Sequence, residues 1–310
     1  MNSHLLLSVI VPAHNPHRGR LERTLAALRT QTLAPAQWET ILVDNASSPP
    51  LEAGAFRDTG PREFRVIPEP QPGLTFARRC GFTAARGQFL VLVDDDNVLQ
   101  PDYLARVVEL FQAHTRVGAL GGRSLPEFES PPASWVREFD GLLACRDPGP
   151  TPLISSGLKN PTTDRPEYPT FAPIGAGLAL RREAVQAWLA DAQALPDRRG
   201  RELSSGGDND MILTLMHHGW EVAYFPGLAL THLIPARRLT AGYLGRLNRG
   251  IQKSWMQVLS RHGANPWPSI PRWTVPLRQA KAWLNHRAWS SPAAHIRWQG
   301  ACGHFEGRGR

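Results

Sequence analysis

Short apolar runs alternate with helical patterns over the first 120 residues of this 310-residue chain. Such alternation is typical of an open sheet of mostly parallel strands whose crossover helices cover both faces. We expect the strands at residues 6–11, 39–43, 64–67 and 89–93, with helices where leucine or alanine recurs at helical spacing. The pattern predicts a doubly wound, Rossmann-like α/β fold of the nucleotide-binding type in this half.

The pattern changes between residues 123 and 173, where ten prolines interrupt any regular spacing. We expect this stretch to be loop-rich, and a long irregular segment inside a compact chain is more often a binding loop or lid than a linker. Regular structure should return with a strand at residues 174–180, helices at 182–190 and 208–218, and a strand at 221–225. Beyond Pro235 the pattern is helical again, until prolines at positions 266, 268, 271 and 276 break it.

The segment from Arg237 to the last residue differs in charge from the rest of the chain. It holds 13 lysines and arginines against a single acid, Glu306, and six of the ten tryptophans. Basic residues interleaved with tryptophan suit a surface that meets anionic lipid headgroups, an acidic glycan or nucleic acid. The alternative is a solvated basic face with packed tryptophans. We treat a peripheral membrane contact as a hypothesis and expect no nucleic-acid partner.

Cysteine usage and the apolar N-terminal run bear on where the chain works. The three cysteines, at positions 80, 145 and 302, are far apart and lack metal-ligand spacing, so neither a disulfide framework nor a zinc site is indicated. The apolar run from Leu5 to Val11 is too short to span a bilayer and lacks the flanks of a signal peptide. We expect a cytoplasmic protein, with any membrane contact peripheral and at the inner face.

The strongest local signal is an apolar run that leads directly into acidic residues. Phe89-Leu-Val-Leu-Val93 is followed by Asp94, Asp95 and Asp96. Ligands of open α/β sheets bind beyond the carboxyl ends of the strands, so these acids stand where a ligand would lie. If the chain stays extended, Asp94 and Asp96 point to the same side, where Mg²⁺ or Mn²⁺ would offset their repulsion and bridge them to a diphosphate. The structural alternative is an acidic helix cap.

Two further polar clusters follow the first and the second expected strands. Val11-Pro12-Ala13-His14-Asn15 ends the first strand, and Val43-Asp44-Asn45-Ala46-Ser47 ends the second. The second cluster suits hydrogen bonding to a base or ribose, although an isolated Asp-Asn pair is usually a turn. Neither a dinucleotide fingerprint nor a Walker-type phosphate loop occurs, so NAD chemistry and ATP hydrolysis are disfavoured.

Taken in order, the Pro-x-x-Asn of the first cluster, the Val-Asp-Asn-x-Ser of the second and the aspartate-rich motif resemble the family 2 glycosyltransferases of the GT-A fold. The resemblance spans about residues 7–235. It implies a GT-A domain over residues 1–235, with a nucleotide-binding half at 1–120 and an acceptor half at 121–235. Residues 236–310 would form a basic, tryptophan-rich helical extension broken by prolines.

The segment from Gly73 to Gly81 is similar to the one that precedes the family's metal motif. By this resemblance Arg78 would contact the diphosphate, while Arg79 stands where the family usually has asparagine. Further on, Gly175-Ala176-Gly177 resembles the family's glycine-containing strand on the acceptor side. Glycines there let a sugar approach the backbone, although a tight β-structure without a ligand explains them nearly as well.

The resemblance also implies the catalytic base and a third metal ligand. Gly206-Gly207-Asp208-Asn209-Asp210 is similar to the family's Gly-Glu-Asp-x-Asp, with Gly207 in place of the usual acid. Asp208 would then be the general base, and a helix N-cap is the alternative role for it. His232, 24 positions later, is similar to the histidine that ligates the metal in some members. Imidazole suits Mn²⁺ acceptably.

Together these motifs imply the transfer of a sugar, with inversion, from a nucleoside diphosphate to an acceptor hydroxyl in polysaccharide or glycolipid assembly. The acceptor would be a saccharide or a lipid-linked molecule. Mn²⁺ or Mg²⁺ would be held by Asp94, Asp96 and His232. The donor nucleotide would contact Pro12, Ala13, Asn15, Asp44, Asn45, Arg78, Asp94 and Asp95. Two alternatives stay open: a nucleotidyltransferase, which normally carries a glycine-rich basic loop after the first strand, and a non-catalytic protein that binds nucleotide sugars.

Overall fold

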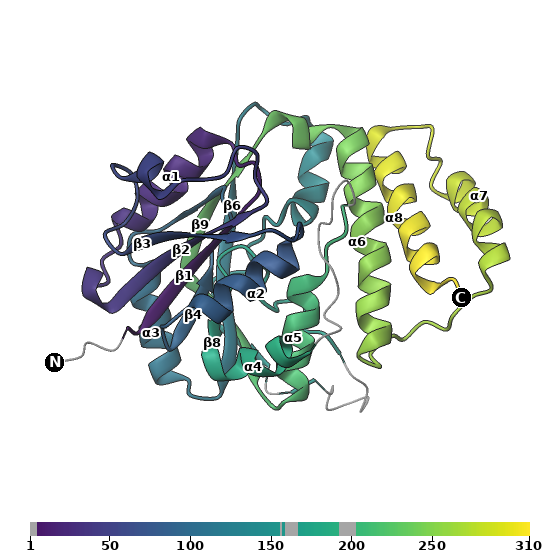
Figure 1. Cartoon of the computed structure of the whole chain (residues 1–310). Coiled ribbons are helices and arrows are strands. Elements are labelled where there is room, and N and C mark those ends of the chain that lie inside the picture. Colours follow the sequence, from purple (N-terminus) through teal and green to yellow (C-terminus); the bar gives the residue numbers. More distant parts are fainter. Residues whose placement is uncertain (1–4, 156, 159–166, 192–202) are drawn as a thin grey trace.

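A sheet of nine strands forms the centre of the computed structural model, within the residues that it describes: 5–155, 157–158, 167–191 and 203–310. The strand order is β3-β2-β1-β4-β8-β6-β9-β5, and β7 pairs with β9 beside this path (Figure 1). The strands are β1 (Leu7–Ala13), β2 (Trp38–Asn45), β3 (Phe64–Glu69), β4 (Phe89–Leu92), β5 (Asn97–Leu99), β6 (Val117–Phe128), β7 (Leu153–Ser155), β8 (Ala179–Arg181) and β9 (Glu221–Ile234).

Strands β1 to β4 form the parallel part of the sheet, and the predictions for all four are confirmed. β1 pairs in parallel with β2 and β4, and β2 pairs in parallel with β3. Every residue of β1, β2 and β4 is buried, because helices cover both faces, and this explains why the apolar runs are nearly continuous. Parallel strands end at the same edge of a sheet, so the polar clusters that follow β1, β2 and β4 come together there.

The second half of the sheet is mixed and more extensive than the sequence indicated. β8 is antiparallel to β4 and β6, and β9 continues nine residues past its predicted end at Phe225. The prediction of a loop-rich stretch was wrong over residues 123–128, because they extend β6 and pair in parallel with β9. The strand predicted at 174–180 is limited to Ala179–Arg181. The predictions for Pro161 and Pro166 fall outside the described residues.

Helices cover both faces of the sheet. α1 and α3 pack on one face through a core that includes Leu25 and Phe111, while α2, α4 and α5 pack on the other through a core that includes Phe82 and Trp188. The helices predicted at 182–190 and 208–218 are confirmed as α4 and α5 to within one residue. The bounds are α1 (Arg18–Arg29), α2 (Leu74–Ala84), α3 (Tyr103–Ala113), α4 (Arg182–Ala190) and α5 (Gly207–His217), with the 3-10 helices η1 (Pro35–Gln37), η2 (Ala53–Phe56) and η3 (Ser134–Leu143).

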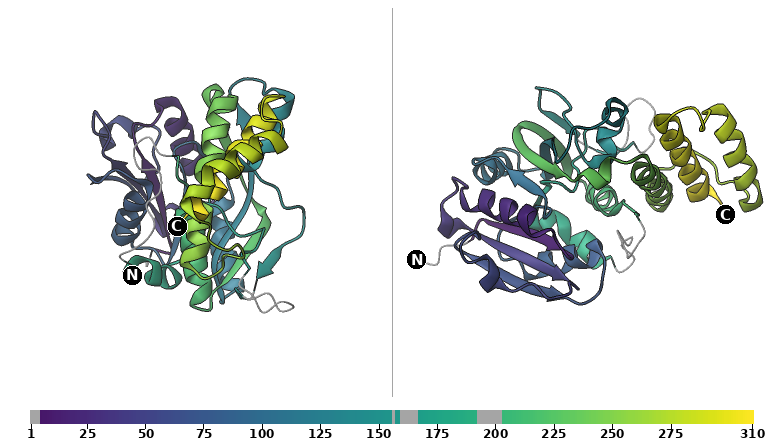
Figure 2. Two further views of the ribbon diagram at one scale, coloured as in Figure 1. Left: turned by 90° about the vertical axis from the view of Figure 1, so that its right-hand side faces the viewer. Right: turned by 90° about the horizontal axis from the view of Figure 1, so that it is seen from above.

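The C-terminal extension is helical, as predicted. α8 packs along α6, and α7 packs on α8, so the three helices form successive layers away from the sheet (Figures 1 and 2). α6 and α8 approach closely at Gly303, where a Cβ would lie 2.0 Å from the carbonyl oxygen of Arg249. Pro276 does not break a helix, because it lies in the first turn of α7, where its missing N–H has no partner to lose. The bounds are η4 (Ala236–Leu239), α6 (Ala241–Arg261), η5 (Arg272–Thr274), α7 (Val275–Asn285) and α8 (Pro292–Arg308).

None of the helices in the described part of the chain combines the length and the apolar character needed to cross a bilayer. The C-terminal extension, residues 236–310, shares a hydrophobic core with the main body. In that core Leu244 and Leu247 of α6 and Ile296 of α8 pack with Val136 and Phe139 of η3. The boundary predicted at residue 235 therefore does not coincide with a gap in the hydrophobic packing.

Candidate active site

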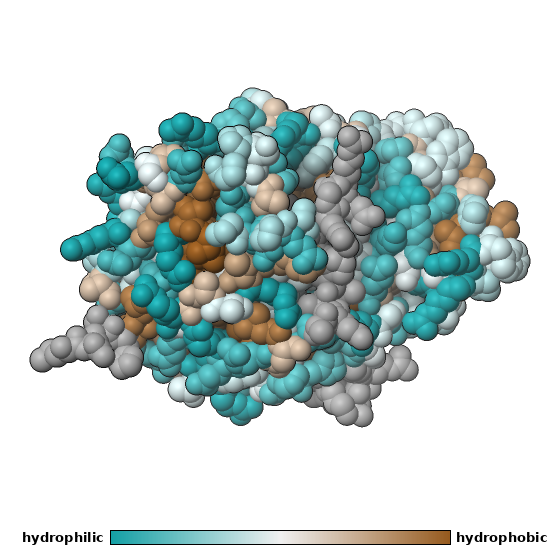
Figure 3. Space-filling model, viewed as in Figure 1, coloured by the Kyte–Doolittle hydropathy of each residue, from teal (hydrophilic) through white to brown (hydrophobic). Residues whose placement is uncertain are grey.

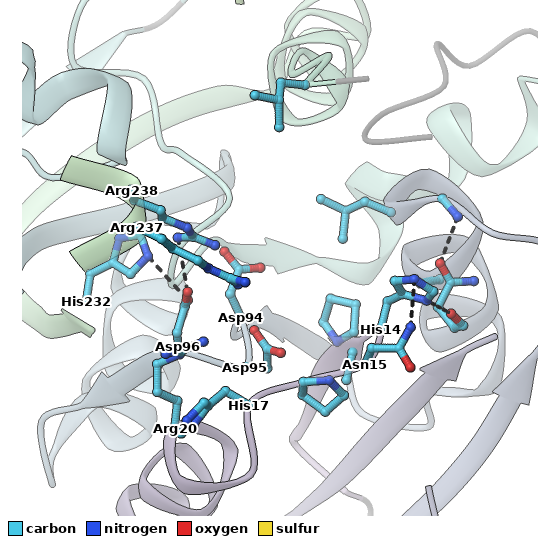
Figure 4. A pocket seen from close by; sticks show the side chains of 18 of the residues that line it. His14, Asn15, His17, Arg20, Asp94, Asp95, Asp96, His232, Arg237 and Arg238 are labelled. Atoms are coloured by element: carbon cyan, nitrogen blue, oxygen red, sulfur yellow. Dashed lines mark hydrogen bonds and ion pairs between the residues drawn. The ribbon is translucent and has the colours of Figure 1, made fainter. Parts of the chain in front are cut away.

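A cleft of about 680 Å³ lies at the edge of the sheet where β1, β2 and β4 end. Its walls come from the loop after β1, the turn after β4, and the segment that leads from the end of β9 into α6 (Figure 4). The predicted donor and metal residues that line it are Pro12, Ala13, Asn15, Asn45, Asp94, Asp95, Asp96 and His232. The fold thus brings residues from both ends of the predicted GT-A domain into one space.

Hydrogen bonds between the loops after β1 and β2 fix one wall of this cleft. Asn15, whose φ is 45°, donates its N–H to Ser47 Oγ at 2.9 Å and accepts the N–H of Ser48 at Oδ1, also at 2.9 Å. Asn45 accepts the N–H of Gly73 at 2.8 Å, directly before α2. These two asparagines therefore hold the ends of β1 and β2 against each other and against the start of α2.

Asp44, which we predicted to contact the nucleoside, lies behind this wall with 6% of its surface exposed. Its Oδ1 accepts the N–H of Ser47 at 3.1 Å, and its Oδ2 accepts the N–H of Leu51 at 2.9 Å. The described residues that line the cleft do not include it. In this geometry the Asp44 carboxylate shapes the loop after β2, and its contact with a nucleoside stays a prediction.

The three aspartates lie on a tight turn between β4 and β5. The N–H of Asn97 donates to the carbonyl of Asp94 at 3.1 Å, which closes the turn. The assumption of an extended chain from Asp94 to Asp96 was therefore wrong, since the backbone bends at this point. Asp95 is partly buried, and burial, followed by the charges of Asp96 and Asp94, raises its pKa to about 7.

Asp96 is the most deeply placed of the three, with 4% of its surface exposed, and two basic side chains hold it. Its Oδ1 lies 3.2 Å from His232 Nε2, and its Oδ2 lies 3.2 Å from Arg238 Nη1. The contact with His232 arises because β5 pairs with β9 and sets Asn97 opposite His232. Arg237 also faces the aspartates, and Arg20 approaches from the other side of the turn (Figure 4).

A second cleft, of about 240 Å³, contains Asp208 and shares one lining residue, Leu74, with the first. Asp208 lies in the first turn of α5, and its Oδ2 accepts the N–H of Gly175 at 2.8 Å. The remaining wall is largely apolar and comes from η3, from the segment before β8 and from α6. It includes Leu142, Ala144, Ile174, Leu247, Ile251, Gln252 and Trp255.

The residues predicted on the acceptor side have separate structural reasons for their identity. Gly175 lines the second cleft, and a Cβ there would lie 2.5 Å from Nη2 of Arg78. Gly177 has a φ of 72°, which favours glycine, and Ala176 is buried in the core. Arg78 lines the second cleft beside Asp208, whereas the described lining of the first cleft does not include it. Its contact with a diphosphate stays a prediction.

Comparison with known families decides the relationship. The model of the family described as Glycosyl transferase family 2 matches residues 8–189, which is more than half of the chain. The chain belongs to this family. The succinoglycan biosynthesis protein ExoM of Rhizobium meliloti is 25% identical over 275 residues, 86% of this chain and 78% of ExoM. The O-antigen biosynthesis protein RfbC of Myxococcus xanthus is 33% identical over 137 residues, 40% of this chain but only 11% of RfbC.

Solved structures show that this family 2 glycosyltransferase has the GT-A fold. GalNAc-T7, crystallised with UDP, GalNAc and Mn²⁺, superposes with a TM-score of 0.55 at 15% sequence identity. The superposition covers 99% of this chain and 56% of the GalNAc-T7 chain. TarS 1-349 of S. aureus superposes with a TM-score of 0.52 at 12% identity and covers 97% of this chain and 89% of its own. Likeness at such low identity establishes the fold only.

The Asp96–His232 pair of this family member offers a carboxylate and an imidazole, both of which are ligand types for Mn²⁺. The 3.2 Å between Oδ1 and Nε2 is the distance of a direct contact between the two side chains. No third histidine, cysteine or acid completes a metal cluster within the described residues. The other ligands would have to be diphosphate oxygens and water, as is usual for Mg²⁺ bound with phosphates. Ligation by Asp94 stays a prediction.

The C-terminal segment contributes to both clefts, which was not predicted from the sequence. Its residues in the first cleft are Arg237, Arg238, Thr240, Tyr243 and Arg246, and those of α6 in the second are Leu247, Ile251, Gln252 and Trp255. The available signal was the recurrence of apolar residues every four positions on α6. Such spacing predicts that one face of the helix is packed but does not identify the surface on which it packs. Residues 236–310 were therefore predicted to be an extension outside the GT-A domain.

The role of Arg79, which the sequence left open, is to cap the C-terminal end of α4. Arg79 itself lies on α2. Its guanidinium donates to the carbonyls of Trp188 and Asp191, both at 3.1 Å, and to that of Leu189. It also lies 5.5 Å from the ring centroid of Trp188. Because the last carbonyls of a helix have no partners within the helix, this cation satisfies them and fixes α4 against α2.

Proposed function

We propose that this glycosyltransferase moves a sugar from a nucleoside diphosphate to an acceptor hydroxyl, with inversion at the anomeric carbon. The observation that carries the proposal is that the two clefts share Leu74 in their lining. One cleft holds an acidic turn faced by arginines, and the other holds the carboxylate of Asp208. A donor lying in the first cleft with its sugar beside Leu74 would present the anomeric carbon to a hydroxyl bound in the second.

In the first cleft the nucleoside would lie between the loops after β1 and β2, against Pro12, Ala13, Asn15 and Asn45. The guanidinium groups of Arg20, Arg237 and Arg238 would bind the diphosphate, since they provide fork-shaped donors for phosphate oxygens. Asp96 and His232, with Asp94 as a further candidate, would hold Mn²⁺ or Mg²⁺. When bound, the cation would neutralise charge on the departing nucleoside diphosphate.

In the second cleft Asp208 would act as the general base. The acceptor oxygen would form a bond to the anomeric carbon while the bond from that carbon to the diphosphate oxygen breaks, and the hydroxyl proton would pass to the Asp208 carboxylate. The N–H of Gly175 orients this carboxylate through Oδ2. A single displacement of this kind requires no covalent intermediate and one carboxylate to accept the proton, which Asp208 would supply.

The relatives indicate which donors and acceptors to test first. TarS and GalNAc-T7 have each been crystallised with UDP, and GalNAc-T7 also with Mn²⁺. ExoM and RfbC are named for succinoglycan and O-antigen biosynthesis. We therefore propose a UDP-sugar as the first donor to test, and a saccharide or lipid-linked acceptor in polysaccharide or glycolipid assembly.

Thermal shift with nucleoside diphosphates and their sugars, with and without Mn²⁺, tests the donor site. One nucleotide should raise the Tm of wild type by several degrees in the presence of Mn²⁺, since a ligand at 100 times its Kd stabilises by about 2.7 kcal/mol. Asp96→Ala should remove this shift, and Asp58→Ala, an exposed acid outside both clefts, should keep it. No shift with any nucleotide would contradict the proposal, and pyrophosphate release from a nucleoside triphosphate would favour a nucleotidyltransferase.

A further inference from the structure

Exposed large apolar side chains gather at the C-terminal end of the molecule. Eight such side chains occur in the described part of the chain, and six of them lie between residues 267 and 289. Single exposed apolar residues are ordinary, but a group of them on one surface marks a site of interaction. The six are Trp267, Trp273, Leu277, Trp283, Leu284 and Trp289.

α7 presents these side chains because only one of its faces is packed. Ala282 is buried against α8, and Gln279 donates from Nε2 to Glu306 Oε1 at 2.9 Å. Leu277 and Leu284 are two turns apart and lie on the opposite face, with 65% and 59% of their surfaces exposed. Brown patches at the right-hand edge of Figure 3, over α7, show this apolar face.

Exposed tryptophans lie shortly before and after α7. Trp273, in η5 directly before the helix, is 74% exposed. Trp289, which follows the helix, is 58% exposed, and its ring centroid lies 4.5 Å from that of Trp283. Together with the two leucines, these rings form the apolar surface of residues 267–289.

The charges on the same surface are all positive. Arg272, Arg278, Lys281 and Arg287 are exposed, and none of the four takes part in an ion pair with any described residue. Glu306 is the single acid from residue 237 onward, and Arg249 and Gln279 already engage it. The surface is therefore apolar and cationic, with no carboxylate of its own to neutralise it.

We propose that the surface of residues 267–289 binds the headgroup region of an anionic lipid bilayer. Tryptophan and leucine insert at the boundary between headgroups and acyl chains, while lysine and arginine attract the lipid phosphates. A second copy of the chain fits less well, because two such surfaces would repel each other. This inference goes beyond the proposed function, since lipid binding requires no sugar transfer. Binding of this surface to a bilayer would hold the second cleft on the membrane side, where a lipid-linked acceptor would lie. The two are connected because α7 packs on α8, α8 packs on α6, and α6 lines the second cleft.

Vesicle flotation of the full chain tests the proposal. Wild type should float with vesicles of phosphatidylcholine and phosphatidylglycerol, should not float with phosphatidylcholine alone, and should be released by high salt. The variants Leu277→Ser/Leu284→Ser and Arg278→Glu/Lys281→Glu should each lower the partition coefficient at least about tenfold. All four side chains are exposed, so the fold should survive, and nucleotide-dependent thermal shift checks this separately.

Matched variants separate this surface from general stickiness and net charge. Leu125→Ser/Ile154→Ser removes two exposed apolar side chains, each 43% exposed, on strands far from α7 in sequence. Arg57→Glu/Arg62→Glu changes the net charge by the same amount on the N-terminal half. Both should float as wild type does. Wild type that fails to float, or control variants that lose as much binding as the α7 variants, would overturn the proposal. So would light scattering that shows a dimer converted to monomer by Leu277→Ser/Leu284→Ser.

Discussion

Two acids in the first turn of α5 have different surroundings, which separates their roles. Asp208 opens onto the second cleft, whereas Asp210 is 1% exposed and lies 3.2 Å from Trp188 Nε1 and 3.0 Å from His262 Nε2. Asp208→Asn should lower kcat for sugar transfer by about 10² to 10⁴, because an amide does not accept the acceptor proton. Donor-induced thermal stabilisation should be unchanged, since Asp208 lies outside the first cleft.

Asp210→Asn is the matched change two positions away. It should lower the free energy of unfolding by about 1–3 kcal/mol, because Trp188, Arg261 and His262 lose a buried charged partner. The kcat of the folded fraction should stay within a few-fold of wild type. An active Asp208→Asn enzyme, or equal losses of kcat in both variants, would contradict the assignment of the base.

A buried carboxylate away from the clefts, Glu39 on β2, links stability to acid pH. Its side chain is 2% exposed, and burial alone would raise its pKa. Hydrogen bonds from Arg86 and Ser8, with the charge of Arg65, outweigh burial and hold the pKa below its ordinary value. A lowered pKa stabilises the fold above the ordinary value of about 4.3, and this stabilisation is lost as pH falls through the folded-state value.

Glu39→Gln should therefore lower the free energy of unfolding by about 1–3 kcal/mol at pH 7, and the difference from wild type should shrink as the pH falls toward 3. Urea titrations at both pH values measure it. Glu52→Gln, an exposed change on the neighbouring loop, should stay within about 0.5 kcal/mol of wild type throughout. A difference for Glu39→Gln that is the same at both pH values would show that packing, rather than ionisation, sets its contribution.

At the level of elements, α6 lines both clefts, because its first turns border the first cleft and its later turns border the second. Tyr243 and Arg246 line the first cleft, and Gln252 and Trp255 line the second cleft. If Gln252 donates a hydrogen bond to the acceptor, Gln252→Ala should raise the acceptor KM about 2- to 10-fold, the loss of one such bond. The Kd of the donor nucleotide should not change.

Lys253→Ala is the control for Gln252→Ala, because Lys253 is the next residue of α6, is exposed and lines neither cleft. Steady-state kinetics with acceptor varied at saturating donor, and nucleotide binding by calorimetry, separate the two effects. A donor Kd that weakens together with the acceptor KM would mean that Gln252 supports α6 rather than the acceptor.

The positions of strands that helices bury on both faces could be predicted from their apolar sequences. The full length of β9, whose sequence is interrupted by proline and glycine, could not. β1 and β2 each contain a short apolar run, at residues 9–11 and 41–43, that ends in a polar cluster, so their positions follow from the sequence. β9 passes through Pro226 and Gly227, which normally end a strand, and it continues because residues 229–234 pair with β6. The proximity of Asp96 and His232 followed from the family resemblance. Arg238 was missed, because a basic residue after a strand has no local pattern that points toward a cleft.

At the scale of the whole molecule, the C-terminal helices share their core with the main body. Leu247 of α6 and Ile296 of α8 pack with Phe139 of η3, and Arg261 at the end of α6 pairs with Asp191 after α4. The first cleft is likewise built from the loops after β1 and β4 together with the start of α6. These shared contacts indicate that the extension and the sheet unfold together.

Urea unfolding followed by two signals tests this coupling. Four of the six tryptophans in residues 237–310 are already exposed, whereas Trp38 and Trp188 of the main body are buried. The change in tryptophan fluorescence on unfolding therefore reports mainly on the main body, whereas far-ultraviolet circular dichroism reports on the whole chain, including the helices of the extension. We expect the two transitions to coincide. A donor nucleotide bound in the first cleft as proposed would contact both parts, so it should move both transitions to higher urea by the same amount. A first loss of circular dichroism at lower urea, without a change in fluorescence and not moved by the nucleotide, would mean that residues 236–310 fold as a separate unit. The residues of α6 that line the first cleft would then contribute little to donor binding.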